Sequence, residues 1–555
     1  MPSRVTLLFH RLGPYHYARL KAASVVMHTT VVEYSDVDEV YAWDEVNGSD
    51  GFDRRWLFHG SPIRQQTTDE IRARVDAVLE EAGPDIVAIP GWIDRPALAA
   101  LRWCCKNRIP AVVMSDSTAW DHPRIWWKEA IKSQIVQCFS SGLVAGTPHA
   151  EYLAALGLPK SRIFPGYDAV DNRYFEDKAA EIRNAQCEIR NDGTTAQSAV
   201  SGNGPSIENE PSKIQNPEFS IPSSHSPFPI SHSKFFLSSA RFIEKKNLFC
   251  LISAFAEFRK MGNGKYEMRN GGMTAVSSLE SNGPDSAGPS NWSLVLLGDG
   301  PLKARLIAHA QSLGLNVVAS APWDEAKAES EPNRVRQTAE GSPEGELASQ
   351  KLKAETSANG SDPSGLRSQA SGLTASNHPA SKIQHPKSTP VASATPLPST
   401  PQPIPTSTTG TGPTVFLPGF KQYHELPEYY ARAGAFVHAS TTEQWGLVVN
   451  EAMASGLPVI VSNRCGCATD LVQEGVNGFT FDPTDVNQLA DLMSRMAGMD
   501  NDQLEKMHAA SRGIIASWGP DRFASGLQQA AEAALAAAPV QPTLLQRLIL
   551  RALRF

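Results

Sequence analysis

The chain has 555 residues, more than one hydrophobic core usually serves, so we expect at least two domains. Its apolar content of 41% is adequate for globular domains, and its formal net charge of −7 gives no electrostatic reason to bind nucleic acid. Seven cysteines lie scattered without a CxxC pair, a pattern typical of reduced thiols in the cytosol. The apolar run at 5–9 is too short for a signal peptide, and no stretch approaches the roughly 20 apolar residues of a membrane-spanning helix. We therefore expect a cytoplasmic protein.

The first part of the chain alternates short apolar runs with amphipathic helical patterns. The pattern predicts helices at 68–82 and 95–106. It predicts strands at 5–9, 86–89, 111–114, 143–145 and 162–165. Strands that alternate with helices indicate a parallel α/β sheet. We expect residues 1–176 to form an N-terminal Rossmann-like domain.

Three later stretches are rich in Asn, Ser, Pro and Gly and lack apolar periodicity. They cover residues 181–232, 262–291 and 317–413. Such a composition cannot bury enough apolar surface to offset its ordering entropy, so we expect three disordered insertions. The sequence SKIQNP at 212–217 returns as SKIQHP at 381–386, which indicates a common origin. Docking segments for a partner are the alternative interpretation.

The second part of the chain repeats the alternation of strands and helices. Strands are predicted at 234–240, 293–297, 415–417, 435–438, 458–461 and 478–481. We expect residues 233–527, interrupted by the second and third insertions, to form a second doubly wound domain. Two such domains facing each other enclose a cleft, and ligands of these sheets bind beyond the carboxyl ends of the strands.

The segment 440–458, STTEQWGLVVNEAMASGLP, has the most informative pattern. A helix over about 447–455 follows a short polar loop, with a Gly-x-Pro stop behind it. The backbone N–H groups of Gly446, Leu447 and Val448 lie at the start of this helix, where an α-helix leaves its donors without intrahelical acceptors. Together with the positive end of the helix dipole, they predict an anion site suited to a diphosphate.

Two carboxylates flank this predicted anion site, Glu443 before the helix and Glu451 inside it. They suit hydroxyl groups on either side of a diphosphate, a sugar at one end and a ribose at the other. On their own, Ser440 and Glu443 also fit a capping box, and Glu451 fits a solvated helix residue. Arg241 and Lys246 favour the binding site, because two cations directly after a strand are well placed to hold a phosphate pair.

The order of these motifs resembles family 4 of the retaining glycosyltransferases, which have the GT-B fold. R-x4-K is followed by a buried strand with the turn at 298–301, GDGP, and then by S-x2-E-x2-G-L-x3-E. The match runs over 233–260, 292–315 and 414–496, essentially the whole ordered second domain. The resemblance implies an α/β protein of two Rossmann-like domains facing each other across a cleft.

The resemblance also implies roles for individual residues of the second domain. Those that would bind the donor are Arg241, Lys246, Gly446, Leu447, Val448 and Glu451. In that family the two cations bind the donor's phosphates, the backbone after the first Glu holds the diphosphate, and the second Glu contacts the ribose. The first Glu contacts the donor sugar, which makes Glu443 a candidate catalytic residue.

The first domain resembles the family more loosely and is expected on the acceptor side. The loop at 12–20, LGPYHYARL, follows the first strand where acceptor and diphosphate usually meet, and Gly13 and His16 are its candidate residues. The run at 140–175 resembles the family's crossing into the second domain. The resemblance implies that Gly13 and His16 belong to the loop that binds the acceptor and the diphosphate.

One position departs from the family pattern. Many members place a His after the strand that corresponds to 111–114, where this chain has Asp116. We expect Asp116 to stand in for that His as a hydrogen-bonding or polarising group, and we treat it as the second candidate catalytic residue. The alternative is that the chain belongs to a subgroup of the family that does without this His. His10 and His122 are further candidates for the cleft, although a lone His near a strand end is more often structural.

The predicted activity is the transfer of a hexose from a nucleotide-sugar donor with retention of configuration, in the synthesis of a cell-surface polysaccharide, a glycolipid or a related glycoconjugate. By resemblance, we expect front-face attack by a glycan or lipid acceptor, with no metal and no cofactor besides the nucleotide-diphosphate sugar itself. A sugar phosphorylase or epimerase of the same fold is one alternative. A non-catalytic nucleotide-sugar-binding scaffold is another, although the intact Glu443, Glu451, Arg241 and Lys246 argue against it.

Residues 528–555 are expected to form a C-terminal helical tail. Its last part separates cations from apolar side chains: Arg547, Arg551 and Arg554 on one face, Leu544, Leu548 and Phe555 on another. A basic amphipathic helix can lie on an anionic membrane, so peripheral contact with the inner membrane face through 543–555 is one prediction. The alternative is a final helix packed back across the first domain.

Overall fold

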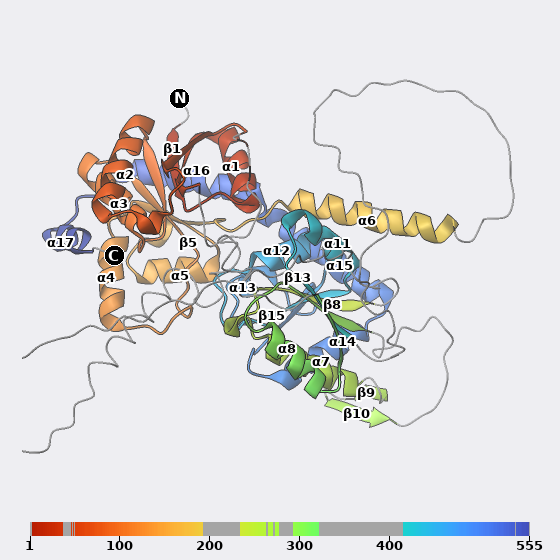
Figure 1. Ribbon diagram of the computed structural model, residues 1–555. Helices are drawn as coiled ribbons and strands as arrows, with labels where there is room; N and C mark the ends of the chain where they lie inside the picture. Colours follow the sequence, from red (N-terminus) through yellow and green to blue (C-terminus); the bar gives the residue numbers. More distant parts are fainter. Residues whose placement is uncertain are drawn as a thin grey trace, which may run out of the picture. The chain divides into compact units, whose positions relative to one another are not determined.

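Two seven-stranded sheets form the framework of the computed structural model (Figure 1). The structure describes residues 3–36, 46, 48, 50–192, 234–261, 265–269, 272–276, 292–320, 414–538 and 540–553. Within these residues both sheets are parallel throughout, as predicted for two doubly wound units. The α/β fold class is therefore confirmed.

The first sheet has the strand order β3-β2-β1-β4-β5-β6-β7. Its strands are β1 Arg4–Phe9, β2 His28–Ser35, β3 Asp53–Phe58, β4 Ile86–Pro90, β5 Ala111–Ser115, β6 Ser141–Val144 and β7 Ile163–Pro165. The helices between them are α1 Pro14–Val26, α2 Thr68–Ala82, α3 Arg95–Asn107, α4 Trp126–Val136 and α5 Thr147–Ala155. The central strands β1, β4 and β5 are almost continuously apolar because helices cover both faces of a parallel sheet.

The second sheet has the strand order β12-β13-β11-β8-β14-β15-β16. Its strands are β8 Phe235–Ser239, β11 Ser293–Leu297, β12 Asn316–Ala319, β13 Thr414–Gly419, β14 Ala435–His438, β15 Val459–Ser462 and β16 Gly478–Phe481. Its helices are α7 Leu248–Met261, α8 Lys303–Ser312, α11 Leu426–Arg432, α12 Leu447–Ala454, α13 Ala468–Leu471, α14 Val486–Ala497 and α15 Asn501–Ile515. Strands β8 and β14 are neighbours, so the loops that follow them lie at the same edge of the sheet.

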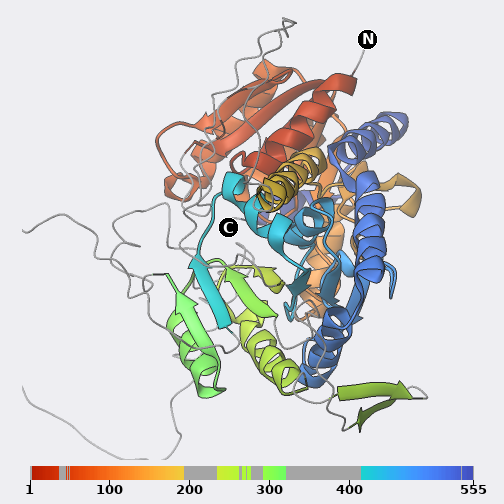
Figure 2. The same ribbon diagram turned by 90° about the vertical axis from the view of Figure 1, so that its right-hand side faces the viewer.

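Three further helices and a hairpin complete the described structure. They are α6 Asn172–Asp192, α16 Pro520–Ala536, α17 Leu544–Ala552 and the antiparallel pair β9 Lys265–Arg269 and β10 Gly272–Val276. The hairpin follows α7 and is not part of either large sheet (Figure 2).

Strands β2, β3 and β12 were not among the predicted strands. In β2 the buried Glu33 interrupts the apolar run that would otherwise indicate a strand. Its carboxylate is paired with the guanidinium of Arg54 from β3 and accepts a hydrogen bond from the backbone N–H of Leu12 at 2.7 Å. In the sequence alone, a charged residue such as Glu33 indicates an exposed position, because its partner Arg54 lies 21 residues away. Strand β12 is at the sheet edge and is only partly buried, so its sequence lacks the continuous apolar run of a central strand.

The predicted insertions overlap with regular structure at three places, and those boundaries were wrong. Residues 181–192 continue helix α6, because the Ala, Glu and Arg residues there favour a helix as readily as a solvated coil. The hairpin β9–β10 occupies part of 262–291, on either side of the Asn270-Gly271 dipeptide, a strong hairpin signal that the composition masked. Residues 317–319 belong to β12, which pairs with β13 from beyond the insertion.

The remaining predicted insertion residues cannot be compared with the structure. They are 193–232, 262–264, 270–271, 277–291 and 321–413, and they lie outside the described residues. The near-repeat at 212–217 and 381–386 falls within them.

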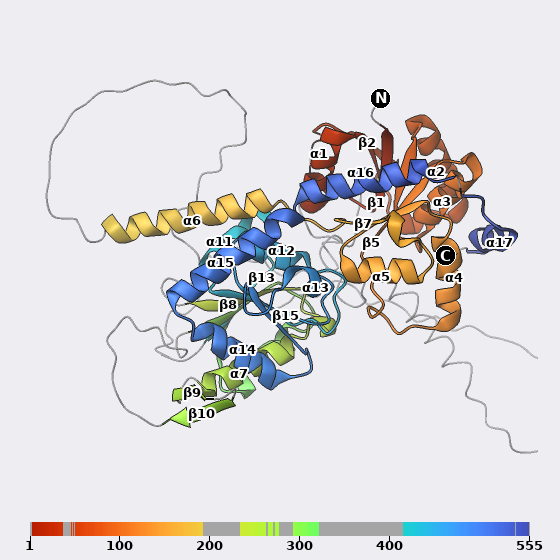
Figure 3. The same cartoon turned by 180° about the vertical axis from the view of Figure 1, so that it is seen from behind.

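Helix α16 returns the chain to the first sheet, and the expected boundary at 527 lies inside it. Its apolar face packs on strands β6 and β7 and on helix α1 (Figure 3). The buried residues of this face are Phe523, Ala524, Leu527, Ala530, Ala531 and Ala534. The hydroxyl of Ser141 in β6 donates a hydrogen bond of 2.6 Å to the backbone carbonyl of Ala530. The predicted packing of the tail across the first domain is thus confirmed for α16.

We expect Leu527→Ala to destabilise the first sheet by about 3 kcal/mol, because Leu527 has no exposed surface and its removal leaves a cavity. Urea unfolding followed by circular dichroism measures the change. Gln529→Ala, on the exposed side of the same helix, is the matched control. Equal midpoints for the two variants would show that α16 does not support the sheet.

Candidate functional site

Glu443 lies between β14 and α12 and is the most strongly paired carboxylate of the predicted site. Its side chain is 14% exposed and forms an ion pair with Lys246. The same oxygen, Oε2, lies 3.3 Å from Nε2 of His438 and accepts a hydrogen bond of 3.2 Å from the hydroxyl of Ser440. Burial opposes the charge, but Lys246 and His438 outweigh it and hold the pKa of Glu443 well below its usual range. Glu443 is therefore ionised at neutral pH.

The loop before α12 is held by backbone hydrogen bonds to the segment after β15. The carbonyl of Glu443 accepts from Gly466 N–H at 3.0 Å, and its own N–H donates to Arg464 at 3.1 Å. Gly446 has φ of 102°, and a Cβ there would lie 2.9 Å from Sγ of Cys465, so only glycine fits without strain. Helix α12 therefore begins at Leu447, as predicted, three residues after Gln444.

Lys246 reaches Glu443 because the connection after β8 is fixed to the loop after β14. The carbonyl of Lys245 accepts from the N–H of Thr441 at 2.9 Å. The side-chain amide of Asn247 donates to the carbonyls of Ala439 at 3.1 Å and Pro483 at 2.8 Å. Asn247 itself is left-handed with φ of 56°, a conformation that Asn tolerates better than most residues.

Lys245 belongs to this site, although it was not among the residues predicted from the sequence. Burial lowers its pKa, Glu443 and Asp116 raise it, and the charges of Lys246 and Arg241 lower it further. The charges of Lys246, Arg241, Glu443 and Asp116 are therefore close enough to Lys245 to shift its pKa, and Asp116 comes from the first sheet. The signal in the sequence was the doubled lysine of IEKKN, of which only the second matched the family pattern.

The turn Gly298-Asp299-Gly300-Pro301 contacts the backbone on both sides of Arg241. The backbone N–H of Phe242 donates to the carbonyl of Asp299 at 2.9 Å. A Cβ at Gly298 would lie 1.9 Å from the carbonyl oxygen of Ala240, so the two loops are in direct backbone contact. This close approach explains the glycine-rich turn and fixes the segment that includes Arg241.

Glu451 is fully buried, so the interpretation as a solvated helix residue is wrong. Its Oε2 accepts a hydrogen bond of 2.8 Å from the hydroxyl of Tyr430 in α11. Its Oε1 accepts one of 2.6 Å from the hydroxyl of Tyr15, in the first turn of α1. Burial raises the pKa of Glu451 to about 7 although both tyrosine hydroxyls lower it. The sequence did not indicate either tyrosine, although Tyr15 lies in the loop already assigned to the acceptor side.

Asp116 is brought to the same loop by a contact across the two sheets. Its Oδ1 accepts a hydrogen bond of 3.3 Å from the side-chain amide of Gln444, the neighbour of Glu443. The backbone carbonyl of Gln444 lies 2.9 Å from Nε2 of His149. Asp116 thus contacts the residue next to Glu443, and its role in place of the family His stays a prediction.

Gly13 and His16 form the start of helix α1. The backbone N–H of Gly13 donates to Nδ1 of His16 at 3.2 Å, so the imidazole serves as a cap. Burial, together with the charges of Arg19 and His10, holds the pKa of His16 well below its usual value. His16 is therefore neutral, and this turn presents Tyr15 toward Glu451.

Arg19 and Asp168 form a buried pair beneath this turn that the sequence did not indicate. The Arg19 guanidinium donates a hydrogen bond of 2.5 Å to the carbonyl of Tyr167 and lies 3.5 Å from the Asp168 carboxylate. Burial raises the pKa of Asp168 to about 6; Arg19 lowers it, and the charge of Glu443 raises it. Asp168 is thus electrostatically connected to the candidate site.

The other two candidate histidines have the following described surroundings. Nε2 of His10 lies 3.4 Å from Oδ2 of Asp94, and its ring packs edge-on against Tyr34 with centroids 4.6 Å apart. His122 lies in the exposed loop before α4. The structural interpretation therefore holds for His10.

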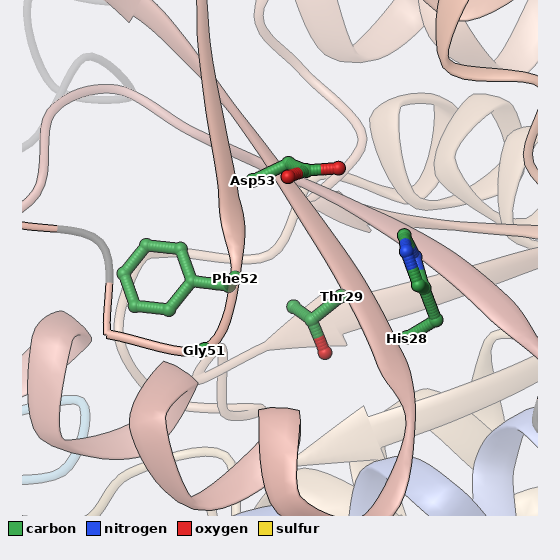
Figure 4. A pocket seen from close by; sticks show the side chains of 5 residues that line it. All are labelled: His28, Thr29, Gly51, Phe52 and Asp53. Atoms are coloured by element: carbon green, nitrogen blue, oxygen red, sulfur yellow. The ribbon is translucent and has the colours of Figure 1, made fainter.

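A hollow of about 300 Å³ lies at the opposite end of the first sheet (Figure 4). It is lined by His28, Thr29, Gly51, Phe52 and Asp53. His28 and Asp53 are the first residues of β2 and β3, so the hollow lies at the amino ends of the strands. Doubly wound sheets bind ligands at the carboxyl ends. We therefore do not include the hollow in the candidate site.

One family model matches the segment that includes Glu443 and Glu451, and known proteins match stretches of the chain. Residues 406–513 match the family described as glycosyl transferases group 1. A stretch of 77 residues is 48% identical to the sulfoquinovosyl transferase SQD2 of Arabidopsis thaliana and covers 13% of this chain and 15% of that relative. A stretch of 84 residues is 37% identical to the sucrose synthase of Thermosynechococcus vestitus and covers 15% of this chain and 10% of that relative. A stretch of 76 residues is 37% identical to the alpha-1,3/1,6-mannosyltransferase alg-2 of Neurospora crassa and covers 14% of this chain and 16% of that relative.

Comparisons with solved structures extend over nearly the whole chain. A glycosyltransferase from Rickettsia africae superposes with a TM-score of 0.50 at 10% identity, covering 96% of this chain and 99% of that one. The structure of trehalose-6-phosphate from E. coli bound with UDP-2-fluoro glucose superposes with a TM-score of 0.52 at 9% identity, covering 97% and 100%. At such identities the likeness shows the fold alone, which is GT-B. With group 1 glycosyl transferases this chain therefore shares the segment 406–513, and with the solved structures it shares the fold.

The buried Glu451 makes the stability of the protein depend on pH. Its pKa of about 7 in the folded state lies above the ordinary value of 4.5, so between these values the folded chain binds more protons than the unfolded chain. Stability contributed by Glu451 is therefore lost as the pH rises through about 7. We expect the thermal midpoint of the wild type to fall relative to that of Glu451→Gln between about pH 5 and about pH 8. Differential scanning calorimetry measures both, and parallel curves would mean that Glu451 is ionised throughout.

Proposed function

We propose that this chain transfers a hexose from a nucleotide-sugar donor to a glycan or lipid acceptor with retention of configuration, as family 4 of the glycosyltransferases does. The observation that supports this best is the convergence of Arg241, Lys245 and Lys246 with Glu443 at the start of α12. Such a site suits a ligand with both a diphosphate and a sugar. The acceptor would belong to a cell-surface polysaccharide, a glycolipid or a related glycoconjugate.

The cations and the start of α12 provide the electrostatics that a departing nucleoside diphosphate requires. As the bond from the anomeric carbon to the phosphate oxygen breaks, negative charge grows on the phosphate. Lys246, Arg241 and the N–H groups of Leu447 and Val448 stabilise this charge without reorganising. Because these groups compensate the charge, the mechanism that we propose requires no metal ion. The nucleotide sugar is a substrate, and no further cofactor enters the reaction.

Glu443 acts on the other reaction partner, the sugar. The anomeric carbon becomes oxocarbenium-like as the phosphate leaves, and a carboxylate that stays ionised stabilises this positive charge. The acceptor oxygen attacks the same face from which the phosphate departs, and a departing phosphate oxygen takes the acceptor proton. The new glycosidic bond then keeps the configuration of the donor.

The residues of the first sheet would serve the acceptor. Asp116, held by Gln444 next to Glu443, polarises the acceptor hydroxyl through a hydrogen bond. Gly13 and His16 form the turn at which the acceptor and the diphosphate meet, and neutral His16 adds no competing positive charge there. The names of the three sequence relatives refer to different sugars, so these matches leave the donor sugar unassigned.

Substitution of Glu443 should separate catalysis from donor binding. We expect one of the UDP-, GDP-, ADP- or dTDP-sugars to bind and to be slowly hydrolysed. Glu443→Gln should reduce hydrolysis by about 100-fold, with a smaller effect on binding, because its charge acts on the transition state. The control is Glu257→Gln, on the exposed side of α7, where the carboxylate pairs only with its helix neighbour Lys260 among the contacts described.

The same assay distinguishes the alternatives. NMR of the first-formed glycoside should show the anomeric configuration of the donor. Binding of no nucleotide sugar would contradict the proposal and favour a scaffold. Glycoside cleavage that requires free phosphate would favour a phosphorylase.

We further propose peripheral contact with an anionic membrane, through α17 and the start of α4. These helices contact each other (Figures 1 and 3). They include six of the twelve large apolar side chains that are exposed in the described part of the chain: Ile125, Trp126, Trp127, Leu544, Leu545 and Leu548. Exposed cations on the same helices are Lys128, Arg547 and Arg551. Tryptophan, leucine and basic residues together suit an interface with anionic lipids.

Helix α17 combines both interpretations of the tail. It buries Leu550 against the first sheet and leaves Leu544 75% exposed. Arg554 and Phe555, which the prediction also used, lie outside the described residues. Within those residues, no helix is both long and apolar enough to cross a membrane.

We expect the full chain to sediment with vesicles of phosphatidylcholine and phosphatidylglycerol, and less with phosphatidylcholine alone. The double variant Leu544→Ser/Leu548→Ser should reduce the bound fraction about fivefold, because two exposed apolar contacts are lost. Val25→Ser, at an 83% exposed position on α1, is the control. Sedimentation that the double variant leaves unchanged would remove α17 as a membrane contact.

A further inference from the structure

The carboxylate of Glu451 is already occupied by two tyrosine hydroxyls. Tyr430 donates to Oε2 at 2.8 Å and Tyr15 donates to Oε1 at 2.6 Å. Burial and the nearby Glu451 raise the pKa of both tyrosines well above the usual value, so both remain hydrogen-bond donors. Glu451 has no exposed surface. A ligand hydroxyl can therefore reach this carboxylate only if one tyrosine moves away.

The two tyrosines differ in how firmly they are held. Tyr430 has no exposed surface, and its ring packs against those of Phe175 and Phe436 with centroids 5.9 Å away in each case. Tyr15 is only partly buried and lies in the first turn of α1, beside the edge of Tyr423 at 5.5 Å. Helix α1 belongs to the first sheet, whereas Glu451 and Tyr430 belong to the second. Tyr15 is therefore the partner that can withdraw.

We propose that the Tyr15 hydroxyl holds the place of a ribose hydroxyl on Glu451 and that the donor nucleotide displaces it. This inference rests on the proposed function, in which Glu451 contacts the ribose. A phenol and a ribose hydroxyl are both neutral O–H donors to a carboxylate, so the exchange leaves Glu451 with the same number of hydrogen bonds. Tyr15 thus competes with the nucleotide for Glu451. The apparent affinity for the nucleotide falls as the fraction of molecules with Tyr15 bound to Glu451 rises.

The exchange has a consequence for the acceptor side. Tyr15 lies between Gly13 and His16, and all three belong to the same turn. Withdrawal of Tyr15 would therefore move a side chain within the turn that the proposed function assigns to the acceptor.

Calorimetric titration of the full chain with UDP, GDP and ADP tests the exchange. Tyr15→Phe keeps the ring and removes the hydroxyl, and we expect it to tighten binding of the preferred nucleotide by about five- to tenfold. Tyr17→Phe is the matched control, because the Tyr17 hydroxyl is on the same helix and is hydrogen-bonded to Asp50. It should leave the affinity unchanged. The 2′,3′-dideoxy form of the same nucleotide should bind wild type and Tyr15→Phe equally.

The possible outcomes are distinct. Equal affinity of wild type and Tyr15→Phe for a nucleotide that does bind overturns the displacement and leaves the proposed function intact. Equal tightening of the ribose and dideoxy forms overturns the ribose exchange, because Tyr15 would then obstruct the site without competing for Glu451. Failure of all three nucleotides, and of dTDP as well, to bind any variant overturns the proposed function and the inference together.

Discussion

The charge of Glu443 is the feature on which the rest of the candidate site depends. A largely buried carboxylate stays ionised only if cations and hydrogen bonds replace the water that it loses. Lys246 and His438 supply them, and they come from segments that follow β8 and end β14. These strands are neighbours in the sheet, and the left-handed Gly446 lets α12 begin directly behind the carboxylate. The strand order, the left-handed Gly446 and the ion pair of Lys246 with Glu443 are therefore parts of one arrangement. The same arrangement places positive charge where we propose that a diphosphate binds.

Contacts from the first sheet reach the same elements. Asp116 accepts from Gln444, Thr147 donates from its backbone to Asp470 at 2.8 Å, and Tyr15 donates to Glu451. Each contact joins a residue that follows a strand of the first sheet to a loop or a helix of the second. These hydrogen bonds therefore connect the predicted acceptor side with the predicted donor side.

The sequence predicted the parts of the fold whose pattern is local. Strands such as β4 and β5 are uninterrupted apolar runs, and α2 has a capping box at Thr67 and Glu70 and ends at a left-handed Gly83. Strand β2 was missed because Glu33 needs Arg54 from β3 to be buried. The candidate residues were found by their spacing within single segments. Lys245, Gln444 and Tyr430 were not, because their roles arise from contacts between segments that are far apart in the sequence.

The central claim is that a diphosphate binds at the start of α12, between Lys246 and Glu443. A crystal structure of the full chain with its bound nucleoside diphosphate tests this most directly. The account predicts phosphate oxygens within hydrogen-bond distance of the backbone N–H groups of Leu447 and Val448, with Lys246 turned toward them. A nucleotide bound elsewhere, such as in the hollow beside His28 and Asp53, would show that the charges around Glu443 serve another purpose.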